Sequence, residues 1–277
     1  MVAHTLLGYL LAVGFSGAAN RFLWSEVLLG LVLWVICLNG GTLAINSAFD
    51  KDEGDIGYLK RPPPAPRRLL ALSVILLVLG QALAFLLPLE FVWAYGICFL
   101  LSILYSVPPF RLKAVAGADW LINMWGFGTL TPYAGWASTG IPLSTDGLVV
   151  LLAFCPLFAA LYPLTQLYQF EEDQRRGDRT LALRLGMKRS LDLAIGMTLL
   201  AFAMLGWAGS LAGWNAQDRD LWRWGGLVAA LVAWLLVLVP WRSSFSRWRP
   251  ERHQRAMYHA LSAWAATDLV VLLGFAT

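Results

Sequence analysis

The stretch VLLGLVLWVICLNGGTLAINSAFDKDEGD, residues 27–55, contains the pattern that decides the fold. Its first part is an apolar run long enough to cross a bilayer, since about 20 apolar residues in a helix span the hydrocarbon. Its last part is acidic, with Asp50, Asp52, Glu53 and Asp55. Carboxylates are costly near hydrocarbon, so an acidic cluster at the end of such a segment indicates a functional site, most simply a divalent-cation site.

A second acidic cluster follows another long apolar segment. It comprises Gln169, Glu171, Glu172, Asp173 and Asp178. Gln169 and Asp173 are four residues apart, so on a helix both side chains would project from one face. The same spacing separates Asn46 from Asp50 in the first cluster. Two clusters of this kind predict one shared site.

The rest of the composition predicts an all-α integral membrane protein. Hydrophobic residues make up 58% of the 277 residues and charged residues 14%, and the mean hydropathy is +0.63; soluble domains are usually less apolar. We place about nine near-spanning helices. They lie near residues 5–19, 24–48, 69–87, 90–107, 119–138, 146–168, 190–212, 222–240 and 257–275. No stretch resembles a soluble second domain, so we expect residues 1–277 to form a single transmembrane domain.

The basic residues predict the orientation of this multi-pass protein in the inner, or cytoplasmic, membrane. All of its 21 Lys and Arg residues except Arg21, Arg219 and Arg223 lie in the loops after the second, fourth, sixth and eighth predicted helices. The positive-inside rule makes these loops cytoplasmic. Both acidic clusters then share the cytoplasmic face, and the N-terminus is cytoplasmic too. Since topology explains the net charge of +4, we expect no nucleic-acid partner.

A short basic loop lies between the two acidic clusters. In Tyr105-Ser-Val-Pro-Pro-Phe-Arg111-Leu-Lys113, two prolines end the fourth helix and leave two cations in one loop. Arg and Lys both recognise phosphate. Mg²⁺ is usually held by one or two carboxylates together with substrate phosphates. The mixture therefore predicts a Mg²⁺–diphosphate site; a solvated loop would explain the bases but not the acids.

Other candidates lie on the helices around this loop. Asp119, just inside the fifth helix, could hydrogen-bond an acceptor or take its proton; the alternative is a helix N-terminal acid favoured by the dipole. Tyr105, Tyr162, Tyr168 and Trp125 could each offer an aromatic face to a cation.

Taken together, these motifs resemble the UbiA superfamily of intramembrane prenyltransferases. The resemblance covers about residues 30–190. It rests on the order of Asn46-x3-Asp50, Tyr105-Ser-x-Pro-Pro-x-Arg111-Leu-Lys113 and an acidic cluster followed by Gly177-Asp178-Arg179-Thr180-Leu181. It implies nine transmembrane helices around a central cavity that is open to lipid, with Mg²⁺ and an isoprenyl diphosphate bound by the two acidic motifs.

The residues and the resemblance together give the expected roles. The metal ligands would be Asn46, Asp50, Glu53, Asp55, Glu172, Asp173 and Asp178. Substrate would be bound by Asn46, Tyr105, Arg111, Lys113, Gln169 and Arg179. The catalytic residues would be Asp50, Asp173, Lys113 and Asp119. The chain departs from the family pattern at Gly54 and Gln169, where the family usually has Asp.

The expected activity is transfer of an isoprenyl group from an isoprenyl diphosphate to a lipophilic acceptor, most commonly an aromatic compound or a quinone precursor, within the membrane lipids. A terpene cyclase of the same superfamily, acting on the diphosphate alone, stays open. A cation-coupled transporter is less favoured: it would have ionisable residues at mid-membrane depth and an inverted repeat, and the centres of these apolar segments are almost free of charge.

Overall fold

The computed structural model describes residues 1–20, 24–50, 65–168, 170, 174, 180–215 and 220–276. This part of the chain is helical throughout and contains no strand, which confirms the predicted all-α class. The first helices are α1 (Val2–Asn20), α2 (Trp24–Leu31), η1 (Val32–Gly40), α3 (Gly41–Asp50), α4 (Leu69–Ala84) and α5 (Leu89–Ser106). There follow η2 (Leu112–Ala114), α6 (Ala118–Asn123), η3 (Met124–Leu130), α7 (Thr131–Ala137) and α8 (Thr145–Leu167). The last are α10 (Leu181–Leu211), α11 (Leu221–Ser244), η4 (Phe245–Arg247) and α12 (Pro250–Phe275).

Several of these elements join end to end. The π-helical segment η1 connects α2 to α3 without a break, so residues 24–50 form one long helix, called helix 24–50 below. In the same way η3, also π-helical, connects α6 to α7 in helix 118–137. Each of the nine predicted apolar stretches therefore lies on one of these helical elements in the described part of the chain, with kinks at Gly14 in α1 and at Gly186 in α10.

Two helices begin earlier than predicted. Helix α10 starts at Leu181 with a short segment that ends in a kink at Gly186 (φ 76°), and its long part follows this kink, close to the predicted residue 190; α12 starts at Pro250 rather than near residue 257. The additional turns contain charged residues such as Arg184 and Arg252, which lower the local hydropathy without preventing a helix. In α12 the Pro lies in the first turn, where its missing N–H costs nothing.

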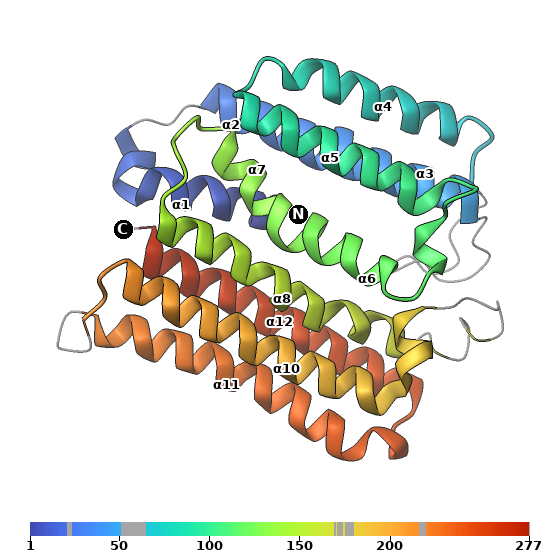
Figure 1. Cartoon of the computed structure of the whole chain (residues 1–277), viewed down its shortest axis with the longest axis vertical. Coiled ribbons are helices and arrows are strands. Elements are labelled where there is room, and N and C mark those ends of the chain that lie inside the picture. Colours follow the sequence, from blue (N-terminus) through green and yellow to red (C-terminus); the bar gives the residue numbers. More distant parts are fainter. Residues whose placement is uncertain are drawn as a thin grey trace.

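Among the described residues, six helices are long and apolar enough to cross a membrane. They are Glu26–Phe49, Leu89–Ser106, Thr145–Leu167, Leu181–Leu211, Leu221–Arg247 and Pro250–Phe275. Helices α1 and α4 are apolar but shorter. Figure 1 shows the helices side by side, with the end of α3, the start of α6, the end of α8 and the start of α10 at one end of the bundle, on the right. The chain segments that carry the predicted metal ligands therefore leave the bundle at that end.

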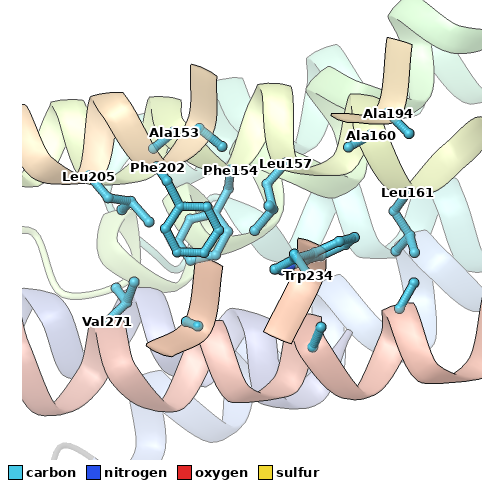
Figure 2. Close-up of a cluster of buried hydrophobic side chains, with 14 of the residues drawn as sticks. Ala153, Phe154, Leu157, Ala160, Leu161, Ala194, Phe202, Leu205, Trp234 and Val271 are labelled. Carbon is cyan, nitrogen blue, oxygen red and sulfur yellow. The ribbon is translucent and has the colours of Figure 1, made fainter. Parts of the chain in front are cut away.

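The second half of the chain forms a solid core. Helix α8 packs against α10 and α12 on one side and against η3 on the other. In Figure 2, Phe154 and Leu157 of α8 meet Phe202 of α10, Trp234 of α11 and Val271 of α12. Alanines between them, at positions that include 153, 160 and 194, allow the helices to approach closely. The cavity described below lies outside this core, between residues of the first half of the chain.

Candidate active site

An apolar cavity of about 190 Å³ lies between helix 24–50, α5 and helix 118–137. Its walls include Leu38, Leu101, Ile122 and Phe127. None of the described residues of α10, α11 or α12 lines it. Met1 also lines the cavity. The cytoplasmic position of the N-terminus stays a prediction.

Both long helices that flank the cavity contain a π-helical segment. Such segments alter the direction of the side chains and occur often at functional sites. At one end of the cavity the Trp34 indole, in η1, donates a hydrogen bond to the Thr131 hydroxyl of helix 118–137 at 3.3 Å. Trp34 is only 1% exposed, and its ring is held edge-on by Phe91 and Tyr95. This end of the cavity therefore has a rigid aromatic wall.

The other end of the cavity is polar. Asn46, in the last turns of α3, lines it, and its Oδ1 accepts hydrogen bonds from Lys113 Nζ at 2.8 Å and from Ser106 Oγ at 3.2 Å. The structure thus brings together one residue of the first acidic motif and one of the basic loop, as the sequence predicted. Ser106 was not predicted, although it lies inside the quoted basic-loop motif.

The turn after α5 explains how Lys113 reaches α3. Helix α5 ends at Ser106, and the prolines that follow cannot continue its hydrogen bonding. Arg111 takes a left-handed conformation with φ 37° and precedes η2, which carries Lys113. The chain turns back here, and Lys113 contacts Asn46. Arg111 itself is exposed and does not line the cavity.

Of the four aromatic residues proposed from the sequence, Tyr105 alone lines the cavity. Its hydroxyl lies 3.2 Å from the Tyr162 hydroxyl of α8. Trp125 is 43% exposed on the outside of its helix. The sequence missed Phe127, which lines the cavity and stacks on Phe158 with ring centroids 5.3 Å apart.

Asp119 is fully buried and does not line the cavity. Its Oδ1 accepts from the Gly117 amide at 2.9 Å. Its Oδ2 accepts from Gln166 Nε2 at 3.1 Å and from the Leu181 amide at 3.4 Å. The predicted contact of Asp119 with an acceptor stays a prediction, and these partners give the carboxylate a different set of neighbours.

The remaining predicted residues cannot be placed by their side chains. Asp50 is the last residue of α3, one turn beyond Asn46, and only its backbone is described. Glu53, Asp55, Gln169, Glu172, Asp173, Asp178 and Arg179 lie outside the described residues. The described residues contain no group of three or more His, Cys, Asp or Glu that could hold a metal, as expected when the predicted carboxylate ligands lie elsewhere. Their roles stay predictions.

Fold and cavity together define a helical membrane protein with an apolar cavity that is polar at one end. The UbiA prenyltransferase family model matches residues 2–264, and the chain belongs to this family. The match confirms the resemblance and extends it beyond residues 30–190. No sequence among the curated proteins matches the chain.

Solved structures share the fold at low sequence identity. A digeranylgeranylglyceryl phosphate synthase superposes with a TM-score of 0.73 at 17% identity, over 99% of this chain and 92% of the other. A UbiA homolog from Archaeoglobus fulgidus bound to DMAPP and Mg²⁺ superposes with a TM-score of 0.66 at 19% identity, over 98% of this chain and 95% of the other. A UbiA homolog from Archaeoglobus fulgidus bound to GPP and Mg²⁺ superposes with a TM-score of 0.66 at 18% identity, over 96% of this chain and 95% of the other.

Proposed function

We propose that this protein transfers an isoprenyl group, within the membrane, from an isoprenyl diphosphate to a lipophilic acceptor. The contact of Lys113 with Asn46 at the polar end of an apolar cavity is the observation that carries the proposal. An isoprenyl diphosphate has a charged head and an apolar tail, which match the two parts of this cavity. The A. fulgidus homolog that binds DMAPP and GPP with Mg²⁺ supports the same ligand class.

The carboxylates proposed for the polar end would suit Mg²⁺, and Asn46 would join them when its Oδ1 exchanges the bonds from Lys113 and Ser106 for the metal. This ion prefers oxygen ligands and is usually held by one or two carboxylates and by substrate phosphates. Helix α3 places Asn46 and Asp50 one turn apart at its end. We propose that these two residues, with Glu53, Asp55, Glu172, Asp173 and Asp178, hold the metal. When bound, Mg²⁺ would neutralise the charge on the departing diphosphate.

The residues at the cavity suit the bond changes of prenyl transfer. The bond between C1 of the isoprenyl group and the diphosphate oxygen breaks, and its electron pair leaves with the diphosphate. Lys113 supplies fixed positive charge where that negative charge develops, an effect that is strongest in a site closed to water. The acceptor then bonds to C1 through an electron-rich atom and loses a proton. The rings of Tyr105 and Phe127 offer faces that stabilise the allylic cation.

The test is to incubate the purified protein with Mg²⁺ and labelled farnesyl or geranylgeranyl diphosphate, with and without an aromatic acid, a quinone precursor or a glycerol-phosphate lipid. We expect diphosphate release and a prenylated acceptor. Chelation should abolish release, and added Mg²⁺ should restore it. A cyclic hydrocarbon formed without acceptor would identify a cyclase instead. Absence of release with every donor would contradict the proposal.

We also propose that the polar end of the cavity faces the cytoplasm, because the basic residues gather at that end of the bundle. Arg247 is exposed in η4, after the end of α11 at this side of the bundle, and Asn215 is exposed shortly after the end of α10 at the other side (Figure 1). In Arg247→Cys, a membrane-impermeant maleimide should label inverted vesicles but not intact cells, and Asn215→Cys should show the reverse. The native cysteines are buried and give a low background. The opposite labelling pattern would invert the proposed orientation.

A further inference from the structure

A buried hydrogen-bond network surrounds Asp119, and the proposed reaction does not use it. The two oxygens of this carboxylate accept from three N–H groups: the amides of Gly117 and Leu181 and the side chain of Gln166. All three donors come from different elements, namely the turn before α6, the start of α10 and the end of α8. Burying a carboxylate is costly unless it is fully hydrogen-bonded, so this arrangement needs a structural or functional reason.

The network replaces the usual cap of α10. The first amides of a helix have no partner inside the helix and are commonly bonded by the N-cap side chain. Here the N-cap residue Thr180 makes no capping bond, and its hydroxyl has no partner among the described residues. The Leu181 amide instead donates to Asp119, and the Ala182 amide donates to Gln166 Oε1 at 3.2 Å. Two other helices thus fix the first turn of α10, the short segment before the kink at Gly186.

The position of this network in the chain connects it to the proposed site. Asp119 follows the basic loop that carries Lys113 by one short turn. Gln166 and Leu181 flank, in the sequence, the segment that contains the second acidic cluster. The hydrogen bonds of Asp119 therefore join the end of the basic loop to the end of α8 and to the start of α10, the two helices that precede and follow the acidic segment in the sequence.

The same network reaches the wall of the cavity. Gln166 also interacts with the Tyr162 side chain one turn earlier on α8. The Tyr162 hydroxyl in turn lies 3.2 Å from the hydroxyl of Tyr105, which lines the cavity. A displacement of Asp119 would thus be transmitted to both the start of α10 and the polar end of the cavity.

We propose that Asp119 is a positioning residue. It holds the basic loop, the end of α8 and the start of α10 in the relative positions that bind the diphosphate and its metal. This inference rests on the proposed function. It differs from the acid–base role suggested by the sequence, because both carboxylate oxygens are engaged by protein N–H groups away from the cavity.

The test compares wild type with Asp119→Asn, a change of equal size in which an NH₂ group replaces one accepting oxygen and faces N–H donors. We expect the donor KM and the half-saturating Mg²⁺ concentration each to rise about tenfold, the effect of losing one hydrogen bond to a charged group. At saturation, kcat should stay within about threefold of wild type, because no group at the reacting atoms is altered. The double variant Asp119→Asn/Gln166→Glu exchanges amide and carboxylate. It restores the bond between positions 119 and 166 but leaves the Leu181 amide facing an NH₂ group, so it should recover only part of the loss.

Binding provides a readout independent of turnover. In isothermal titration of the detergent-solubilised full chain, a non-hydrolysable isoprenyl thiolodiphosphate with Mg²⁺ should bind Asp119→Asn about tenfold more weakly than wild type. The matched control is Asp192→Asn, since Asp192 also accepts hydrogen bonds, from Arg242, but on the surface of α10. It should bind like wild type.

Two results would overturn the inference: unchanged KM and Kd in Asp119→Asn, or a fall in kcat alone, which would indicate direct acid–base chemistry. If Asp119→Asn fails to fold, as judged by melting temperature, Gln166→Met takes its place, and unchanged binding in that variant overturns the inference too. Wild-type protein that binds the analogue but turns over no donor would contradict the proposed function instead.

Discussion

Replacing Asp50 or Asp173 by alanine is expected to lower Mg²⁺-dependent diphosphate release by roughly a thousandfold or more. In the proposed site these two carboxylates, one from each acidic cluster, hold the metal that neutralises the leaving group. Removing either carboxylate should lower the rate of diphosphate release more than any other single change, because the negative charge of the departing diphosphate develops beside the metal. The two helices that precede these clusters, α3 and α8, end at the same side of the bundle (Figure 1).

The measurement is the rate of diphosphate release across a range of Mg²⁺ concentrations, with variants first shown to be folded by their elution in detergent. Glu90→Ala is a suitable control, because Glu90 is an exposed carboxylate in the first turn of α5, at the opposite end of the bundle. It should behave as wild type. Full turnover in both Asp50→Ala and Asp173→Ala would refute the metal assignment.

Replacing Lys113 by methionine is expected to lower kcat/KM by about a hundredfold, the order of magnitude lost when one preorganised charge or donor is removed from an active site. Lys113 is half-buried beside Asn46, so methionine keeps most of the apolar contact and removes only the ammonium group. Lys113→Arg should recover part of the activity, because it retains the charge but presents it as a planar fork.

Steady-state kinetics with varied donor will measure this effect. Lys188→Met provides the matched control, since Lys188 is exposed on α10 and has no part in the proposed site. Wild-type kcat/KM in Lys113→Met would exclude Lys113 from diphosphate binding and would leave the Asn46 contact as a structural bond only.

The helices themselves could be predicted from the sequence because apolar length is a strong signal. Helix α8, for example, begins and ends within one residue of the predicted stretch 146–168. The segment from Leu181 lies outside the predicted stretch because Arg184 lowers its hydropathy, and Gly186, a residue type that often ends a helix, is where the structure has a kink with φ 76°. The order of the motifs led us to expect Lys113 and Asn46 at one site, but not the direct contact between their side chains.

Other parts of the site could not be predicted. The partners of Asp119 come from α8 and α10, and the rotation of those helices about their axes decides which polar residues meet. A buried Asp and a buried Gln in separate apolar segments do indicate that each needs a partner, but not which one. The π-helical segments have no local sequence pattern that marks them, and so Trp34 could not be distinguished from the other tryptophans as a cavity residue.

The rigid aromatic wall at Trp34 limits the length of the hydrocarbon chain that the cavity can hold in an extended form. Trp34 and Asn46 lie twelve residues apart on helix 24–50, a separation of at most about 18 Å at 1.5 Å per residue. An extended carbon chain advances about 5 Å per four-bond repeat, by the geometry that gives a polypeptide about 3.5 Å for three bonds. Three or four such repeats fill the distance from the Asn46 carboxamide to the Trp34 indole. A longer hydrocarbon has to bend or leave sideways past Leu43, which lines the cavity and is 56% exposed on the outer face of the helix.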